Sequence, residues 1–215
     1  LSMSKILRQT GLTRHDYQVI SDWIAPNSHV MDLGCGNGAL LKHLQQEKNV
    51  TGYGVELDPN KIAQCVENGV NVIQTNLDKG LDHFNTDDFD YVILSLTLQA
   101  MRNPKALLQE MMRVGKQGIV TFPNFAYWRN RLQLGLGGYM PVSEELPHKW
   151  YDTPNIHLCT IKDFRALCEQ LDFTIESSLA VHRTGRQGLS LKLMPNLFGE
   201  IALCRFSKKT IKYSA

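Results

Sequence analysis

The sequence lacks any long hydrophobic run and any strong excess of charge of one sign. Its 215 residues include 23 lysines and arginines and 21 acidic residues, which give a formal net charge of +2. Nucleic-acid-binding domains usually concentrate basic residues on one surface, so we expect no nucleic-acid partner. No apolar stretch approaches the roughly 20 residues that span a bilayer, so we expect no membrane segment. The first 16 residues also lack the apolar segment of a secretory signal peptide.

Cysteine is scarce and scattered along the chain. No two of the five cysteines have the spacing of a metal site or of a redox motif: Cys35, Cys65, Cys159, Cys168 and Cys204. We therefore expect neither a disulfide framework nor a bound metal, and this usage is typical of a reduced, cytoplasmic protein. Hydrophobic residues make up 43% of the sequence, which is enough to fill the core of one domain.

Two kinds of apolar segment alternate through the first two thirds of the chain. Short apolar runs predict strands at 30–33, 53–56, 71–74, 89–96 and 118–122. Apolar residues at helical spacing predict a helix at 14–24 and further helices between the strands, two of which begin at Asp58-Pro59 and Asn103-Pro104. This alternation implies a parallel sheet with right-handed crossovers, which is a doubly wound α/β fold.

The pattern changes after residue 122. Residues 123–158 are rich in aromatic residues, glycine and proline, and show no clear periodicity beyond Phe125, Trp128 and Leu132. Thr160, followed three residues later by Asp163, predicts the start of one more helix. Closing strands are predicted at 173–176 and 201–206, and residues 182–199 are predicted to form the loop between them.

A glycine-rich turn stands out in "VMDLGCGNGALLKHL". Gly34, Gly36 and Gly38 join the first predicted strand to a helix, so a ligand can approach the backbone at a helix N-terminus. A plain left-handed turn is the alternative interpretation. The second strand ends in Glu56, roughly 20 residues after the last glycine, which is the spacing of a carboxylate that binds ribose. The combination predicts a nucleoside site, in which Cys35 is simply a small residue that fits the turn.

Asp32 distinguishes between the nucleosides that such a turn could bind. It lies two residues before the first glycine, where it would repel a pyrophosphate by on the order of several kcal/mol. No Walker-type lysine follows the glycines, which disfavours a nucleoside triphosphate. S-adenosylmethionine carries a sulfonium and an ammonium cation and no phosphate, so Asp32 would attract it. Asp32 could also serve as a turn or helix-capping carboxylate, and the two roles can coexist.

The segments "VMDLGCGNG" and "YGVELD" resemble the class I S-adenosylmethionine-dependent methyltransferases. The resemblance implies a Rossmann-like fold with a mostly parallel seven-stranded sheet, an antiparallel closing strand and helices on both faces. It also implies that Glu56, followed by Leu57, grips the ribose hydroxyls, and that Asn76 and Leu77 line the adenine. Many family members have an acid at the position of Asn76, but an asparagine oxygen can still accept a hydrogen bond from the adenine amino group.

The segment "FDYVILSLTLQ" resembles the fourth-strand motif of the same enzymes. That resemblance would place four residues beside the sulfonium: Ser95, Leu96, Thr97 and Gln99. Together, these likenesses imply S-adenosyl-L-methionine or S-adenosyl-L-homocysteine as the cofactor. They also divide the expected single domain into a nucleoside-binding core (14–122), an aromatic and glycine-rich segment that is either a lid or an interface (123–158), and a closing helix and strands (159–206).

A closer resemblance extends over most of the chain. The segments "VNVIQTNLDKGL", "VTFPNFAYWRNRLQLGLGGYMPV" and "LPHKWYDTPNIHLCTIKDF" resemble the MetW family of methionine-biosynthesis proteins. Members of this family are associated with the homoserine O-acyltransferase of the pathway. The resemblance therefore implies an accessory or regulatory partner of that enzyme built on a methyltransferase scaffold. A small-molecule methyltransferase with an unknown acceptor remains the alternative.

The residues themselves offer no clear catalytic pair. His157 is the best single candidate for a base, although a histidine that bonds to loop backbone is the interpretation we favour. Four aromatic residues in the 123–158 segment could cage an apolar or cationic acceptor or anchor a partner surface: Tyr127, Trp128, Trp150 and Tyr151. Arg129 adjoins them, and Gln99 is a further substrate or partner candidate. As a group they favour a recognition surface.

Overall fold

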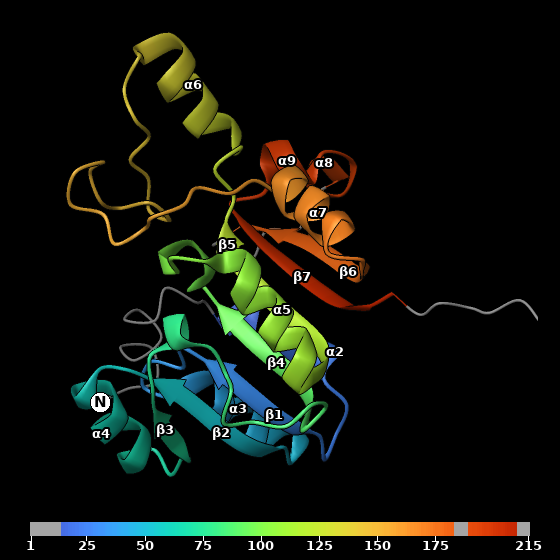
Figure 1. The fold of residues 1–215 in the computed structure, drawn as a ribbon. Helices are drawn as coiled ribbons and strands as arrows, with labels where there is room; N and C mark the ends of the chain where they lie inside the picture. The colour runs from blue at the N-terminus through green and yellow to red at the C-terminus, as the bar shows by residue number, and fades with distance from the viewer. Residues whose placement is uncertain (1–13, 183–188, 210–215) are drawn as a thin grey trace, which may run out of the picture.

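The computed structural model describes residues 14–182 and 189–209 and contains one seven-stranded sheet (Figure 1). The strands lie in the order β3-β2-β1-β4-β5-β7-β6. Strands β1 to β5 pair in parallel, and β7 runs antiparallel to both of its neighbours. The expected methyltransferase-like sheet with its antiparallel closing strand is confirmed. The strands are β1 (His29–Leu33), β2 (Thr51–Glu56), β3 (Val72–Gln74), β4 (Phe89–Ser95), β5 (Gly115–Pro123), β6 (Phe173–Val181) and β7 (Ile201–Lys208).

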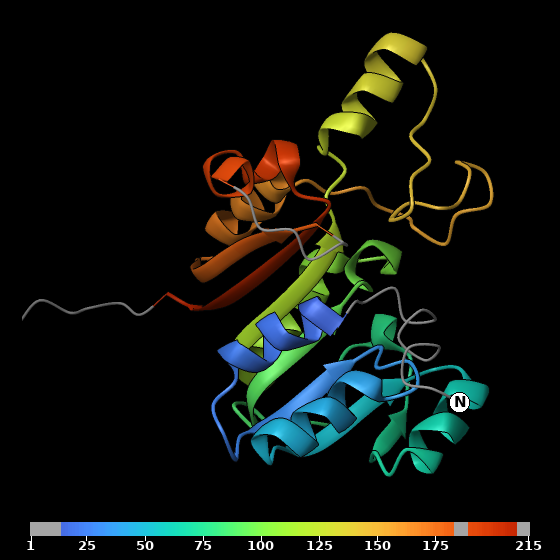
Figure 2. The same cartoon turned by 180° about the vertical axis from the view of Figure 1, so that it is seen from behind.

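Helices cover both faces of the sheet. Figure 1 shows α5 and α7 in front of the strands, and Figure 2 shows α2 and α3 on the opposite face. The helices are α2 (Arg14–Trp23), α3 (Ala39–Lys48), α4 (Pro59–Glu67), α5 (Pro104–Val114), α6 (Trp128–Gly137), α7 (Ile161–Gln170), α8 (Leu189–Leu193) and α9 (Pro195–Phe198), with short 3-10 turns η1 (Leu77–Lys79) and η2 (Leu98–Ala100).

Side-chain alternation along the strands builds two hydrophobic cores. In β4, Val92 and Leu94 point into the core beneath α5, whereas Tyr91 and Ile93 point into the core beneath α2 and α3. Successive strand residues face opposite sides of a sheet, so a strand covered on both faces must be apolar throughout. This requirement explains the uninterrupted apolar run that identified β4 in the sequence.

The predicted helix starts are confirmed by their capping contacts. The side chain of Asp58 accepts a hydrogen bond from the backbone N–H of Asn60, 2.9 Å away, at the start of α4. Thr160 and Asp163 form a reciprocal capping box at the start of α7. Each cap satisfies backbone donors that the first helical turn leaves without partners.

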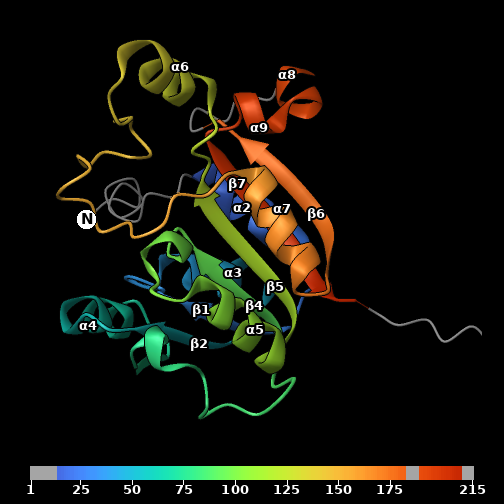
Figure 3. The ribbon, with the colours of Figure 1, turned by 45° about the horizontal axis from the view of Figure 1, so that its top comes forward.

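The prediction for residues 182–199 is wrong in its described part, because α8 and α9 occupy much of the expected loop. Both helices are at most five residues long, so neither shows enough periods for an apolar repeat to be recognised. Helix α6 likewise lies in the segment without clear periodicity. Its leucines 132, 134 and 136 are all exposed, so it has no single buried stripe. Figure 3 shows α6 and the chain that follows it standing apart from the sheet.

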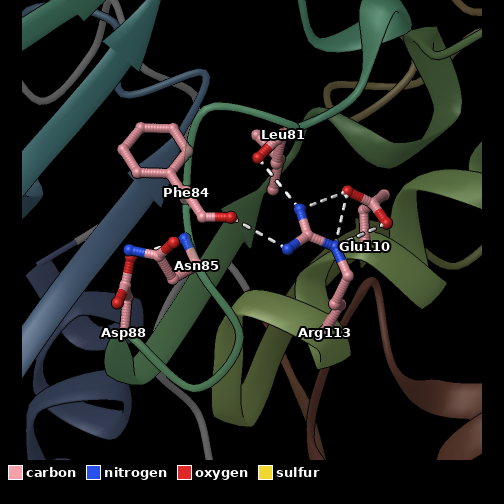
Figure 4. A network of polar contacts seen from close by, with 6 residues as sticks. All are labelled: Leu81, Phe84, Asn85, Asp88, Glu110 and Arg113. Carbon is pink, nitrogen blue, oxygen red and sulfur yellow. Dashed lines mark hydrogen bonds and ion pairs between the residues drawn. The ribbon is translucent and has the colours of Figure 1, made fainter.

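Arg113, at the end of α5, fastens the loop that leads into β4 (Figure 4). Its guanidinium donates to the carbonyl oxygens of Leu81 and Phe84 at 3.0 and 2.8 Å and to the carboxylate of Glu110 at 2.7 Å. This hydrogen bonding lowers the pKa of Glu110. The arrangement satisfies loop carbonyls that face the protein, and it fixes the amino end of β4.

Candidate functional site

The glycine turn between β1 and α3 requires glycine for steric reasons. Gly34, Gly36 and Gly38 have φ values of 70°, 59° and 75°, in the left-handed region that side chains disfavour. A Cβ on Gly34 would also lie 2.8 Å from the hydroxyl oxygen of Thr97. The backbone N–H of Gly34 donates to the carbonyl of Val55 at 2.8 Å, which holds the turn against β2.

Glu56 is the last residue of β2, and its carboxylate binds the backbone of the same glycine turn. One carboxylate oxygen accepts from the N–H of Gly36 at 2.9 Å, and the other accepts from Leu57 and Asp58 at 2.8 and 3.1 Å. The residue is 8% exposed. Each carboxylate oxygen has two lone pairs, so the oxygen that accepts from Gly36 can take a further donor such as a hydroxyl.

Asp32 is a buried carboxyl group with an acceptor that the protein leaves unused. It is 2% exposed, and its Oδ1 has no hydrogen-bond partner among the residues that the structure describes. Burial, and secondarily the charge of Glu56, raise the pKa of Asp32 to about 7. A buried carboxyl group with an unused acceptor and a raised pKa is stabilised most by a cationic ligand that carries hydrogen-bond donors.

Asp32 and the glycine turn line a cleft of about 420 Å³ at the carboxyl ends of β1 and β4, which we call the nucleoside cleft. Glu56 contacts the turn through Gly36 but is not among the lining residues. Seven of the predicted residues line it: Asp32, Gly34, Cys35, Gly36, Ser95, Leu96 and Thr97. Seven lining residues were not predicted as ligand contacts: Tyr17, Asn37, Leu40, Asp58, Asn60, Lys61 and Gln64. Asn37, Leu40 and Asp58 lie within the quoted motifs without having been assigned a ligand contact, and the other four lie on α2 and α4, which no motif connected with the ligand.

Other predicted cofactor residues lie around the nucleoside cleft without lining it. Leu57 is exposed, Leu77 packs in the core, and Asn76 caps η1 by accepting from the N–H of Asp78 at 3.0 Å. Gly38 begins α3, where a Cβ would contact Val70 and Cys65.

Cys35 packs beneath the turn. Its Sγ lies 3.8 Å from that of Cys65, and a Cβ on Gly54 would come within 2.4 Å of it. A hydrogen bond with Cys65 and burial raise the pKa of Cys35, so its thiol stays protonated. These contacts agree with a small packing residue rather than a reactive thiol.

His157 bonds to loop backbone. Its N–H and that of Ile156 both donate to the carbonyl of Gln99, at 3.0 and 2.8 Å. The exposed His157 ring has its Nε2 3.4 Å from the carbonyl oxygen of Arg102. The side chain of Gln99 is buried and donates to the carbonyl of Leu96. These contacts agree with the interpretation of His157 as a histidine that bonds to loop backbone.

The predicted aromatic group is divided between two places. Tyr127, Trp128 and Arg129 lie together, with the Arg129 guanidinium 5.4 Å from the centre of the Trp128 ring, and they line a second cavity at the end of β5. Trp150 and Tyr151 pair edge to face in the exposed loop after α6 and do not line that cavity.

Residues 14–182 and 189–209 lack two features. They contain no group of three or more histidine, cysteine or acidic side chains placed to hold a metal ion. Within the same ranges, every helix falls short of the length and apolarity that crossing a bilayer requires.

Comparisons with known sequences identify the family. The family model described as methionine biosynthesis protein MetW matches residues 14–206. The bifunctional methionine biosynthesis protein MetXA/MetW of Rhodopirellula baltica is 36% identical over 203 residues. That match covers 90% of this chain and 33% of the relative, so the chain spans about a third of the relative's length.

Comparisons with solved structures identify the fold. A SAM-dependent methyltransferase from Thermotoga maritima has a TM-score of 0.64 and 16% identity, with 96% of this chain and 94% of that chain covered. The plantazolicin methyltransferase BpumL, solved in complex with SAH, has a TM-score of 0.60 and 17% identity, with 96% and 84% covered. These proteins share the class I methyltransferase architecture of the sheet described above. With the family model matched over residues 14–206, the chain belongs to the MetW family of methionine biosynthesis proteins.

Proposed function

We propose that this chain binds S-adenosylmethionine or S-adenosylhomocysteine in the nucleoside cleft and acts in the cytoplasm as an accessory partner of homoserine O-acyltransferase. The ligand proposal rests on the Oδ1 of buried Asp32, which has no hydrogen-bond partner among the described residues, and on the nearby charge of Glu56. This pair of carboxyl groups favours a cation and repels phosphates. A methyltransferase of the same fold solved with SAH supports the same class of ligand.

Residues that line the nucleoside cleft and residues around it would hold different parts of such a ligand. Glu56 would accept the ribose hydroxyls, and Asp32 would attract the methionine ammonium, directly or through water. The glycine turn would let the backbone approach the ligand closely. Asn76 and Leu77 would flank the adenine. The sulfonium, when bound, supplies an activated methyl group, which a binding protein can hold without transferring.

The partner proposal rests on the relative whose name joins MetXA and MetW in one bifunctional protein. Fusion keeps two units together at high effective concentration, which is useful when one acts on the other. For the ligand to regulate the partner, it must bind the free and the complexed chain with different affinities.

The test of the partner mixes the purified chain with the acyltransferase and measures acyl transfer with and without S-adenosylmethionine. A rate that depends on the chain and responds to the ligand is expected. A rate that the chain leaves unchanged under both conditions would remove the partner proposal.

The ligand proposal is tested by calorimetric titration with S-adenosylmethionine, S-adenosylhomocysteine, NAD and ATP. Saturable binding of the first two compounds alone is expected. Binding of NAD or ATP in place of the adenosyl-sulfur compounds would contradict it.

We predict that Glu56→Ala weakens the binding of S-adenosylhomocysteine by about 1–3 kcal/mol, because charged hydrogen bonds are lost. Thermal stability should also fall, because three backbone N–H groups lose their acceptor. The exposed Glu47→Ala on α3 is the matched control and should change neither quantity. Unchanged affinity in Glu56→Ala would show that the ribose lies elsewhere.

We also predict that S-adenosylmethionine binds more tightly as the pH rises, and that the increase levels off above about pH 7. Asp32 must release its proton to attract a cation, and its pKa is raised to about 7. Below that pH, the association constant should change by up to about tenfold per pH unit. Titrations across this range measure the slope, and an affinity that falls with rising pH would contradict the role of Asp32.

A small-molecule methyltransferase is the second candidate, favoured by the cavity beside Tyr127 and Trp128 that could admit an acceptor. Incubation with methyl-labelled cofactor and a metabolite extract should then label one product. An extract that stays unlabelled with folded, cofactor-bound protein would reject this candidate.

A further inference from the structure

Most of the large hydrophobic side chains that the structure exposes lie in helix α6 and in the loop that follows it. We call residues 128–158 the arm, and Figure 3 shows it projecting from the sheet. Its exposed side chains include three leucines of α6 and three aromatic residues of the loop: Leu132, Leu134, Leu136, Tyr139, Trp150 and Tyr151. Apolar side chains concentrated in this way on the surface of a protein mark an interaction site.

The last two turns of α6 are exposed around their whole circumference. Residues 131–140 are all exposed, and Leu132 and Leu134 lie about 200° apart around the helix axis. A helix of ten residues is only marginally stable in water unless tertiary contacts bury part of its surface. Gly135 and Gly137 are poor helix formers and weaken it further. The packing that α6 needs is therefore not supplied by the described part of this chain.

The leucines of α6 do not belong to a lid over either cavity. Among the described residues that line the nucleoside cleft, none comes from the arm. The second cavity, at the end of β5, is lined by residues at the start of α6 together with His182 and Glu200, whereas the leucines of α6 lie outside its lining. A lid places its side chains against the ligand that it covers. The exposure of these leucines therefore indicates a surface for another protein.

The arm belongs to the part of the chain that is shared with the MetXA/MetW relative. The match to that protein covers 90% of this chain, which is too much to leave out the internal arm, and the family model spans residues 14–206. The name of the relative joins MetXA and MetW in one bifunctional chain. The arm is therefore a feature of the unit that the relative keeps beside a second activity, which favours that second activity as the partner of the arm.

The positions of the leucines favour a groove over a second copy of α6. In a twofold contact between identical helices, each helix covers one side of the other. Such a contact would bury Leu132 and Leu136, which lie on one side of α6, and would leave Leu134 on the other side exposed. A groove that encloses the helix buries both sides, as in the recognition of single helices by their partner proteins.

We propose that α6 inserts into an apolar groove of the homoserine O-acyltransferase and that the arm is the surface through which the two proteins associate. This inference rests on the partner in the proposed function and adds the contact surface. Burial of Leu132, Leu134 and Leu136 in the groove supplies the packing that α6 lacks in the free chain. Because the arm does not line the nucleoside cleft, the contact leaves that cleft open to its ligand.

The test measures the affinity of the purified full chain for the purified acyltransferase by surface plasmon resonance. The double variant Leu132→Ser/Leu136→Ser removes two apolar side chains from one side of α6, and its affinity should fall by about tenfold or more. Val66→Ser is the control, because Val66 lies on α4 outside the arm and is 67% exposed. It should bind like the original chain. Thermal unfolding of both variants should match that of the original chain, since the replaced side chains are exposed.

Hydrogen exchange locates the contact independently of the substitutions. The backbone N–H groups of residues 131–137 should exchange more slowly in the complex than in the free chain, whereas those of α4 should be unchanged. The inference is overturned, with the partner still in place, if the original chain binds and the folded double variant binds equally well, or if α6 gains no protection. An original chain that does not bind the acyltransferase would remove the partner proposal and this inference together.

Sedimentation of the chain alone distinguishes the groove from a second copy. We expect the free chain to be a monomer at micromolar concentration. A dimer that Leu132→Ser/Leu136→Ser dissociates and Val66→Ser leaves intact would show that α6 is covered by a second copy, and it would overturn the inference.

Discussion

Replacing Asp32 with asparagine is expected to stabilise the folded protein above neutral pH while weakening cofactor binding by tenfold or more. The carboxyl group is 2% exposed, and its pKa is raised from 3.8 to about 7. Its charged form is therefore disfavoured in the fold relative to the unfolded chain. Asparagine has nearly the same shape but no charge, so the substitution removes that penalty together with the attraction for a cation.

The pH dependence of stability follows from the same shift. Between about pH 4 and 7 the folded protein holds a proton on Asp32 that the unfolded chain has released, so unfolding releases that proton. The contribution of Asp32 to stability therefore falls as the pH rises through this window and is constant above it. At about pH 8, the free energy of unfolding of Asp32→Asn should exceed that of the unsubstituted protein by about 2–4 kcal/mol.

Urea unfolding of both proteins at several pH values measures the difference, and Asp152→Asn in an exposed loop is the matched control. The free energies of unfolding of the two proteins should converge below about pH 4, where Asp32 becomes protonated in both the folded and the unfolded state. An Asp32→Asn protein that is less stable at pH 8 and still binds S-adenosylmethionine normally would contradict both halves of the prediction. It would show that Asp32 is a structural turn carboxylate.

The sequence predicted those parts of the fold that short-range patterns determine. The alternating strands and helices, the capped starts of α4 and α7, and the glycine turn each follow from residues close together in the chain. Asp32 and Glu56 lie near each other because β1 and β2 are parallel neighbours and end at the same edge of the sheet. The position of these two carboxylates beside the glycine turn could therefore be predicted from the sequence.

What the sequence did not predict depends on contacts between distant segments. His182 and Glu200 were not predicted as site residues, because neither lies in a motif. They meet only because β6 and β7 pair antiparallel, which brings the end of one strand next to the start of the other. The division of the aromatic group is similar. Tyr127 packs against His182, while Trp150 lies in the loop after α6, and their different surroundings depend on the path of that loop.

Gly52→Ala is expected to have the largest effect on stability of the substitutions considered. Gly52 lies in β2, opposite Val30 of β1, with a φ of 142°. A Cβ at this position would lie 1.8 Å from the carbonyl oxygen of Val30, which is a backbone atom fixed by the sheet. The chain can accept alanine only by separating β1 from β2. We expect the free energy of unfolding to fall by more than about 4 kcal/mol. The variant should then be largely unfolded at ordinary temperature and show no cooperative unfolding transition.

Gly135→Ala makes the same chemical change in α6, where the added methyl group would have no atom within 4 Å from the described residues outside its own helical turn. Alanine is the better helix former, so this variant should be as stable as the original protein or more stable by up to about 1 kcal/mol. Thermal unfolding followed by circular dichroism compares Gly52→Ala with Gly135→Ala. Equal melting temperatures would show that β1 and β2 are not held together as described. Because Glu56 ends β2 and Asp32 lies on β1, Gly52→Ala should also abolish binding of S-adenosylhomocysteine, although residue 52 does not line the nucleoside cleft.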